Sequence, residues 1–482
     1  MVDLLELTAI ELGEAYRLRR VSPVEVTRAV LQAAEATQST LNAFAVLNAE
    51  GALASAEQAE RRWFRGAALS ALDGVPISIK DNVYVEGMPT RFGSLAIPAE
   101  RATGPDSPCA ARLREAGVIL FGKTTMPDYG HKMVTDSPLT GVTRNPWSVE
   151  HSPGGSSGGA AAAVAAGIGP IAIGTDGAGS IRIPAAWTGV FGLKSSLGRV
   201  PHHPRGAFGS YSHVGPMTRT VADAARVMKT ITQPDARDWY SLPYSSIDYE
   251  LLLAEDLRGT HVAFSSCLGL AVATDAEISR AVEQAATVFE ALGARVELAD
   301  PPAVDQCTLV ADLHFTTAAA QLVSFLGARA SLLDASLLAL AEAGARVPAS
   351  AVLDALAKRA ELGTRVNQFF EHFDLVLAPV IPFGAPVLMQ IDPNLVLPPL
   401  LTQWCNVTGL PAASICCGFS RDGLPIGLQI IGRRWDDVRV LCASYAYELA
   451  RGQLSRLEGY RRAPLGCRSP HDNAPHSGVS GP

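Results

Sequence analysis

A glycine- and serine-rich segment at residues 154–159, GGSSGG, is the first stretch of the sequence that could do chemistry. It precedes an alanine-rich run and could cradle a phosphate at a helix start, but it lacks the Gly-Lys-Ser/Thr ending of a P-loop. Its Gly155-x-Ser157-x-Gly159 spacing also fits a nucleophile elbow, although the HSPGG residues before it do not read as the strand that this motif needs. The alternative to both of these sites is a flexible glycine loop that has no catalytic or binding role.

A second candidate segment, TDGAGSIRIP at residues 175–184, places a serine in a turn of small residues. In such a turn the backbone N–H groups of Gly177, Ala178, Gly179 and Ser180 can point at one spot and bind a developing oxyanion. Each donor of this kind lowers a reaction barrier by about 2.7–4 kcal/mol. The alternative is an ordinary β-turn that carries a surface serine.

Lys80 is the third candidate, because it ends the apolar run PISI. A lysine at the end of a buried strand is costly unless it is paired or neutral. Desolvation lowers the pKa of a lysine, so that it can act as a base near neutral pH. The alternative is a structural salt bridge to Asp81 or to another acid.

The histidines offer a serine nucleophile no clear general base. His471 and His476 lie near the C-terminus, and His202 and His203 form a pair, expected to be exposed, in a proline-rich loop. Since a serine nucleophile needs a base nearby, the sequence favours Lys80 for that role.

Together, the three segments resemble the motifs of the amidase signature family. GVPISIKD contains Lys80, GGSSGG contains Ser156 and DGAGSIR contains Ser180, and the gaps between these residues also match the family. The resemblance covers roughly residues 5–455. It extends to the segments FGKTTMPDYG, TRNPW, IPAAWTGVFGLKSS, NVTGLP and GLPIGLQIIG.

The resemblance implies an amide hydrolase with a Ser-cisSer-Lys triad. In the family mechanism, neutral Lys80 would accept a proton from Ser156, which in turn accepts one from Ser180. Ser180 then attacks the amide carbonyl and forms an acyl-enzyme, and the same relay protonates the leaving amine and activates water. The resemblance also implies a cis peptide bond between Gly155 and Ser156, and it implies no cofactor.

Further site residues follow from the same resemblance. The oxyanion hole corresponds to Gly177, Ala178 and Gly179. The positions that support the triad correspond to Ser157, Asp176 and Arg182. The acyl pocket lies near Gly130, His131 and Met133. The sequence departs from the family at Ala178, where glycine is usual, and the added methyl group could narrow the acyl site.

The sequence leaves three candidate functions open. The favoured one is a stand-alone amidase for aryl or alkyl carboxamides, because no ionic clamp is recognisable near the motifs. The alternative is the A subunit of a tRNA-dependent amidotransferase, which shares the triad. The third is a binding relative without catalysis, which an intact triad disfavours.

Local patterns indicate an α/β fold, in which a mixed β-sheet core is covered by helices on both faces, as in the amidase signature fold. Residues 1–65 are predicted to be helical and to pack on the core, with Ser22 as an N-cap, Pro23 at the first position and Glu25 completing the cap. Strands are predicted at 74–82 and 118–123, with a helix at 109–118 between them.

The chain divides by composition into three expected regions. The helical segment 1–65 is followed by a core at 66–463, in which residues 250–370 are a more variable helical region that could wall the substrate pocket. The segment 464–482 is polar and rich in proline and glycine, so we expect it to be disordered.

Charge and composition exclude several partners. The net charge is −7 and no basic run of five residues occurs, which argues against nucleic-acid binding. The longest apolar stretch identified, 160–174, is too short and too broken for a membrane span, and the N-terminus does not resemble a secretory signal, so a cytoplasmic address is expected.

No Cys/His spacing predicts a metal site. The eight cysteines, among them Cys405, Cys416 and Cys417, are expected to be reduced, mostly core residues. The partner is a small-molecule amide, and the sequence leaves the oligomeric state open, with a homodimer as one option.

Overall fold

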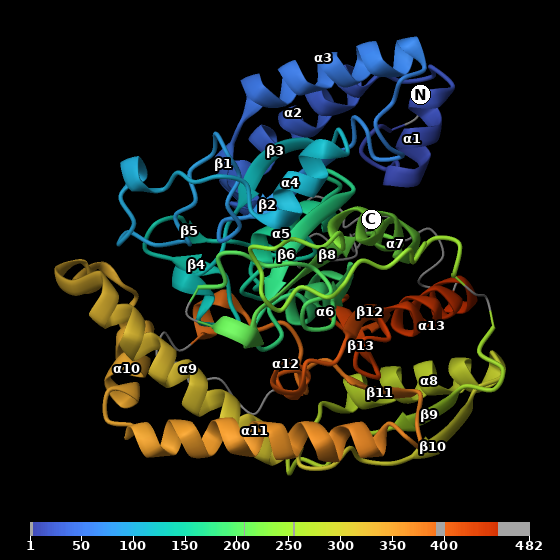
Figure 1. The fold of residues 1–482 in the computed structure, drawn as a ribbon. Coiled ribbons are helices and arrows are strands. Elements are labelled where there is room, and N and C mark those ends of the chain that lie inside the picture. Colours follow the sequence, from blue (N-terminus) through green and yellow to red (C-terminus); the bar gives the residue numbers. More distant parts are fainter. Residues whose placement is uncertain (1–2, 207, 254–255, 392–400, 452–482) are drawn as a thin grey trace, which may run out of the picture.

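An eleven-stranded mixed β-sheet runs through the residues that the computed structural model describes, 3–206, 208–253, 256–391 and 401–451 (Figure 1). The strand order is β1-β3-β2-β6-β8-β7-β12-β13-β11-β9-β10. The strands are β1 (Phe44–Leu47), β2 (Pro76–Lys80), β3 (Ile119–Thr124), β6 (Ile171–Asp176), β7 (Phe191–Lys194), β8 (His213–Thr218), β9 (His261–Phe264), β10 (Arg295–Leu298), β11 (Leu375–Pro379), β12 (Ala412–Phe419) and β13 (Pro425–Gly432). A separate two-stranded sheet pairs β4 (Asp136–Ser137) with β5 (Gly141–Val142).

Helices cover both faces of the large sheet. On one face lie α5 (Gly158–Ala165) and α6 (Arg182–Thr188), and on the other lie α4 (Pro108–Glu115), α7 (Val221–Ile231), α8 (Ala276–Ala291) and α13 (Asp437–Ala450). The predicted α/β fold with a mixed sheet and helices on both faces is therefore confirmed.

Glycines in the strands explain how α6 approaches the sheet so closely. A Cβ atom on Gly192 would lie 2.8 Å from the Cβ of Ala185, and one on Gly427 would lie 2.5 Å from the Cβ of Ala186. The alternating neighbour Leu193 points to the opposite face and joins the core beneath α7, α8 and α13. The period-2 geometry of the strands thus separates a glycine face from an aliphatic face.

The N-terminal helices α1 (Ala9–Arg17), α2 (Pro23–Leu41) and α3 (Ala49–Arg65) cover the end of the sheet that carries β1 and β3, at the top of Figure 1. α2 begins as predicted. Ser22 Oγ accepts the N–H of Glu25 at 3.1 Å, and the Glu25 carboxylate accepts the N–H of Ser22 at 2.8 Å. The predicted helix at 109–118 ends earlier, at Glu115, because Gly117 adopts a positive φ of 82°.

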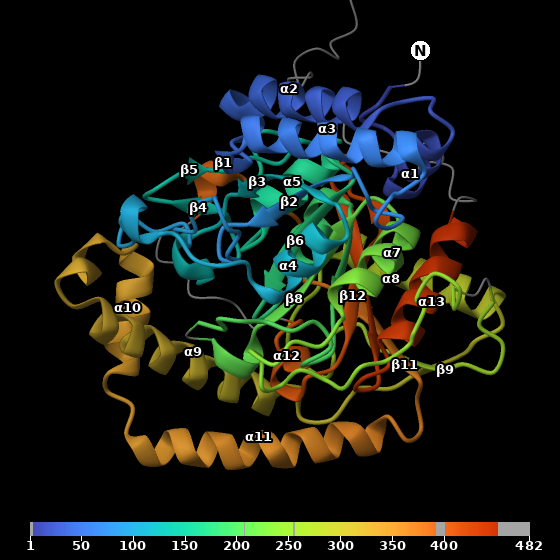
Figure 2. The same ribbon diagram turned by 45° about the horizontal axis from the view of Figure 1, so that its top comes forward.

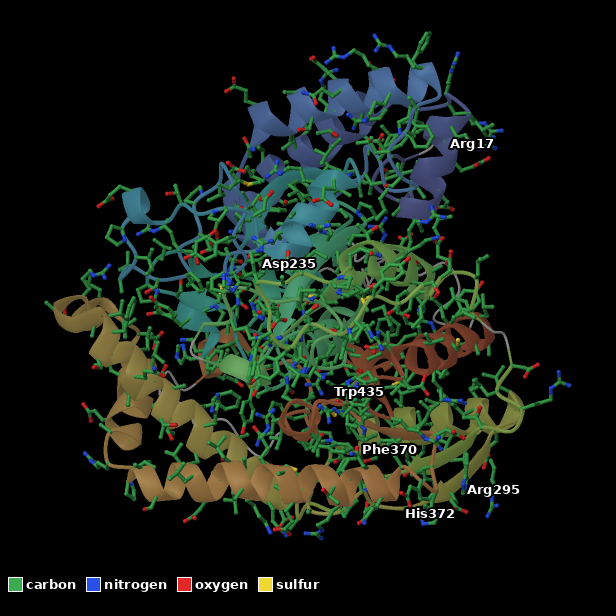
Figure 3. The ribbon with its side chains drawn as sticks, in the orientation of Figure 1. Arg17, Asp235, Arg295, Phe370, His372 and Trp435 are labelled. Carbon is green, nitrogen blue, oxygen red and sulfur yellow. The ribbon has the colours of Figure 1, made fainter. Side chains whose placement is uncertain are left out.

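Three further helices form a separate layer, which lies below and to the left of the sheet in Figure 1 and in the turned view of Figure 2. They are α9 (Val304–Leu326), α10 (Ala335–Gly344) and α11 (Ala349–Phe369), and the short α12 (Trp404–Thr408) packs between this layer and the sheet. In Figure 3 the side chains of Arg17 on α1 and Arg295 on β10 point outward at opposite ends of the molecule.

One stretch of the described residues, Val304–Leu332, is long and apolar enough to cross a membrane by length and composition alone. This stretch differs from residues 160–174, which the sequence analysis took as the longest apolar stretch. A second candidate arises only if α10 and α11, which meet at 95°, are counted as one bent span. Core helices can pass the same test, and α9 packs against both α10 and α11. The expected disorder at 464–482 lies outside the described residues.

Candidate active site

Lys80 ends β2 and is completely buried. Its Nζ atom lies 2.8 Å from Ser156 Oγ, 2.8 Å from Ser157 Oγ and 3.3 Å from the carbonyl oxygen of Thr175. Burial lowers the pKa of Lys80 to about 7, and the carboxylate of Asp176 only partly opposes this shift. At neutral pH a buried amine with this pKa is therefore partly in its neutral form, which can accept a proton.

Asp81 is not the partner of Lys80, although it is the next residue in the chain. Its carboxylate accepts the N–H of Gly93 at 2.9 Å and lies 3.8 Å from the Nζ of Lys123 on the neighbouring strand β3. Successive side chains of a strand point to opposite sides, so the salt bridge weighed from the sequence does not form.

The segment 154–159 is a tight loop that leads into α5. The peptide bond between Gly155 and Ser156 is cis. A Cβ atom on Gly155 would lie 2.7 Å from the backbone of Met133, and one on Gly159 would lie 2.3 Å from Thr125 Oγ1. The glycines therefore let the loop pack directly against neighbouring backbone and side chains.

Ser157 does not sit in a nucleophile elbow. No strand precedes it in the structure, and its hydroxyl is buried, where it donates to the carbonyl oxygen of Thr175 at 3.1 Å. Its N–H donates to the carbonyl oxygen of Ser180 at 3.1 Å. Ser156 and Ser180 line the cavity described below, whereas Ser157 lies behind them.

The turn that carries Ser180 connects β6 to α6 and is held by Asp176. Asp176 Oδ1 accepts the N–H of Gly179 at 2.7 Å, and Oδ2 accepts that of Ile181 at 3.1 Å. The Gly179 N–H is therefore occupied, which differs from its expected place in the oxyanion hole. We find no partner for the N–H groups of Gly177, Ala178 or Ser180 among the described residues.

The alanine at position 178 fits this turn without a backbone penalty. Within the turn only Gly179 has a positive φ, of 131°, and a Cβ atom there would lie 2.4 Å from Thr402 Oγ1. The conformational demand for glycine thus falls on residue 179 and not on residue 178.

A buried polar network fixes Asp176 from behind. Arg182 donates to both Asp176 oxygens at 2.9 Å, and its Nη2 also donates to Asn406 Oδ1 at 2.7 Å. Asn406 Nδ2 donates in turn to Asp176 Oδ1 at 3.0 Å, and Gln429 accepts from Arg182 at 2.8 Å. Burial opposes the charge of Asp176, but the Arg182 guanidinium holds the pKa of that carboxyl well below its usual range.

Asn406 and Gln429 are site residues that the sequence did not identify individually. The one feature of the sequence that could have identified them is their place in the family-like segments NVTGLP and GLPIGLQIIG. Amides give no pattern of their own, and both residues lie more than 200 positions from Asp176. The pairing of β13 with β12 and β11 brings Gln429 behind the turn, and the packing of the short helix α12 brings Asn406 there.

A cavity of about 920 Å³ opens in front of these groups. Ser156, Ser180, Gly177 and Ala178 line it together with Gly130, His131 and Met133. Its other walls are mainly apolar. They include the rings of Tyr84, Phe92, Tyr129, Phe208 and Phe315 and the aliphatic side chains of Ala318, Ala319, Leu322, Leu337 and Leu340 on α9 and α10.

His131 links the loop beside Ser156 to α10. Its Nδ1 lies 2.7 Å from the carbonyl oxygen of Asp128 and its Nε2 lies 2.6 Å from Ser336 Oγ. Burial lowers the pKa of His131 to about 4, so the ring is neutral at physiological pH. At Gly130, a Cβ atom would lie 3.1 Å from Ser156 Oγ, so the chain passes close to that hydroxyl.

His202 does not form an exposed pair with His203, as the sequence suggested. His202 is buried and lines the cavity, and burial lowers its pKa to about 3, whereas the side chain of His203 points to solvent. The Asp238 carboxylate accepts the His202 N–H at 2.9 Å and fixes this loop. The proline-rich pattern did not reveal that tertiary contact.

Cys405, Cys416 and Cys417 are buried and free, in agreement with the expected core packing. Nothing in the structure explains why two cysteines, Cys416 and Cys417, follow each other in β12. Among the described residues, no group of three or more His, Cys, Asp or Glu side chains could hold a metal ion.

Known proteins resemble this chain over nearly its whole length. Residues 25–441 match the family profile Amidase. An acylamidase from Rhodococcus erythropolis is 34% identical over 459 residues, which are 92% of this chain and 95% of that protein. The A subunit of glutamyl-tRNA(Gln) amidotransferase from Agathobacter rectalis is 31% identical over 486 residues, covering 93% of this chain and 95% of the relative.

A solved structure of a bacterial aryl acylamidase of the amidase signature enzymes superposes with a TM-score of 0.87 at 32% identity, covering 96% of this chain and 99% of that one. The chain therefore belongs to the amidase signature family. It is an enzyme that hydrolyses carbon–nitrogen bonds, and enzymes of this class act on small amide substrates.

Proposed function

We propose that the chain hydrolyses a carboxamide through an acyl-enzyme on Ser180, with Ser156 and Lys80 as the proton relay. The observation that carries the proposal is the 2.8 Å separation between Lys80 Nζ and Ser156 Oγ beside a cavity that Ser180 also lines. A lysine with a pKa of about 7 can take the proton that a neutral serine relay must give up.

In the first half of the reaction, Ser180 Oγ bonds to the amide carbon while its proton passes to Ser156 and the Ser156 proton passes to Lys80. The carbonyl oxygen gains the negative charge, and the N–H groups of Gly177, Ala178 and Ser180 are the donors available to it. The C–N bond then breaks, and the leaving amine takes the proton back through the relay.

In the second half, water attacks the ester carbon of acylated Ser180 and loses its proton to the same relay. Collapse of the second tetrahedral intermediate frees the carboxylic acid and restores the Ser180 hydroxyl. Ser157 orients Lys80 through its hydroxyl, and the Asp176–Arg182 pair holds the Ser180 turn. Gly130, His131 and Met133 form the wall of the cavity nearest Ser156, which suits the acyl group.

The substrate class that fits is an amide with aryl or alkyl groups. The cavity walls are mainly aromatic and aliphatic, and its volume of about 920 Å³ exceeds that of a small aliphatic amide. The similarity to an aryl acylamidase supports the same class. The seven cysteines of the described residues form no disulfide with one another, which suits a reducing compartment such as the cytoplasm.

The alternative function is the A subunit of a tRNA-dependent amidotransferase, and the sequence similarity to such subunits supports it. The deciding experiment is a hydrolysis assay of the purified chain against anilides, alkyl amides and glutamine. Turnover of an anilide by the chain alone supports the amidase. Activity confined to glutamine, and dependent on added partner subunits, would support the alternative.

A further inference from the structure

The cavity contains one charged side chain that the described protein residues do not neutralise. Lys132 Nζ lies 2.8 Å from Asp334 Oδ2, and Arg205 Nη2 donates to Asp238 Oδ2 at 2.7 Å. The third charged lining group, Asp312, has no ion pair and no side-chain hydrogen bond among the residues that the structure describes. The cavity therefore carries an uncompensated negative charge at this point.

Asp312 lies on the wall of the cavity that leads to the Ser180 turn. It precedes Phe315 and Thr316 by three and four residues on α9, so all three share one face of the helix, and all three line the cavity. The ring of Phe315 meets that of Phe208 edge to face at 5.3 Å. Phe208 in turn covers Gly177, since a Cβ atom there would lie 3.8 Å from the Phe208 ring.

The surroundings of Asp312 make a counter-ion favourable. Asp312 is exposed at the open side of the cavity, and its partial desolvation there raises the pKa of its carboxyl group. A carboxylate that loses part of its hydration regains free energy when a cation approaches. Arg359, on the adjoining helix α11, does not pair with Asp312: it stacks on Tyr211 at 4.1 Å and donates to the hydroxyl of Ser210.

We propose that Asp312 is a specificity-determining residue that selects amides carrying a protonated amine away from the reacting carbonyl. The ammonium group would donate to the Asp312 carboxylate while the apolar body of the substrate packs on Phe315 and Phe208. This inference builds on the proposed amide hydrolysis at Ser180 and names the substrate class within it, namely cationic amides with an aryl or alkyl body.

The first test measures binding and does not depend on turnover. Calorimetric titration compares 4-methylbenzylammonium with the neutral 4-methylbenzyl alcohol, on the wild-type chain and on the Asp312→Asn and Asp305→Asn variants. Asp305 is the matched control, because it is an exposed aspartate on the same helix that does not line the cavity.

We expect the wild-type chain to prefer the ammonium by up to about fivefold, the range of a solvent-accessible ion pair. The preference should vanish in Asp312→Asn, persist in Asp305→Asn and shrink as salt is added. The inference is overturned if Asp312→Asn keeps the preference. It is also overturned if Asp305→Asn loses it equally, because the net charge of −7 would then account for the effect.

The second test measures turnover with two matched acetanilides, one with a para-methyl and one with a para-aminomethyl group. Asp312→Asn should lower the ratio of kcat/KM for the cationic over the neutral anilide, mainly through KM. An unchanged ratio with good turnover contradicts the role of Asp312 and leaves the proposed hydrolysis standing. If neither anilide nor any other amide is cleaved, the proposed hydrolysis fails, and the binding preference still decides the role of Asp312.

Discussion

The Nζ atom of Lys80 lies 2.8 Å from the Oγ atom of Ser156; Lys80 is completely buried at the end of β2, and Ser156 lies between it and the cavity. Burial disfavours the ammonium form, which is why the pKa of Lys80 falls to about 7. Burial therefore favours the neutral amine, which is the form that the proposed base requires.

The pH dependence of amide turnover should report the proton on Lys80. Its pKa is lowered, so the group is protonated and inactive as a base below about pH 7 and becomes neutral above it. We expect kcat/KM for a neutral anilide to rise as the pH increases through about 7. A profile that falls over this range would contradict the assignment of Lys80 as the base.

Replacing Lys80 by alanine should remove that rising limb and lower amide turnover by about 10²–10⁴-fold, the usual contribution of a general base. A labile ester should lose less, because its leaving group needs no proton. The control is His131→Ala, since His131 lines the same cavity with both ring nitrogens engaged. If the histidine variant alone reproduces the altered pH profile, the base has been misassigned.

Ser180→Ala should abolish amide turnover and covalent labelling by a fluorophosphonate, because the variant lacks the proposed nucleophile. Ser157→Ala is the matched comparison. It removes a hydroxyl that contacts Lys80 but does not line the cavity, so labelling should persist at reduced rate. Mass spectrometry of the labelled peptides decides, and label lost from Ser157→Ala while retained by Ser180→Ala would restore the nucleophile-elbow hypothesis.

Removing a methyl group at residue 178 and adding one at residue 179 should have different effects on kcat. Ala178→Gly should fold and keep most of its activity, because Ala178 has an ordinary backbone conformation. Gly179→Ala should lose about 10²-fold or more in kcat, because its methyl would collide with Thr402 and displace the turn. Circular dichroism confirms that both variants are folded, and equal kcat values would contradict this account.

Asp176→Asn should lower the free energy of unfolding by about 3–5 kcal/mol, because it leaves the guanidinium of Arg182 buried without its counter-charge. Urea denaturation measures the loss. The control is Asp256→Asn, which breaks the solvent-exposed ion pair with Arg258 and should leave the unfolding midpoint unchanged. Similar midpoints for both variants would mean that the Asp176 network does not stabilise the fold.

Local sequence was enough to predict several elements and the three clusters of the site. The Ser22–Glu25 capping box, the strand that ends at Lys80 and the glycine loop around Ser156 all depend on neighbours within a few positions. Short-range hydrogen bonds and alternating hydrophobicity determine these features, so they can be predicted from the local sequence. The family resemblance and the α/β class followed from the same motifs, and both are confirmed.

Contacts between distant segments were decided only by the tertiary structure. The sequence could not say that Asn406 and Gln429 would meet Arg182, or that His202 would be buried. The contacts of Arg182 depend on the place of β13 in the sheet and on the packing of α12, and His202 is held by Asp238, 36 residues further along the chain. A sequence motif specifies which groups are present, but the long-range burial of apolar surface determines which of them meet and with what pKa.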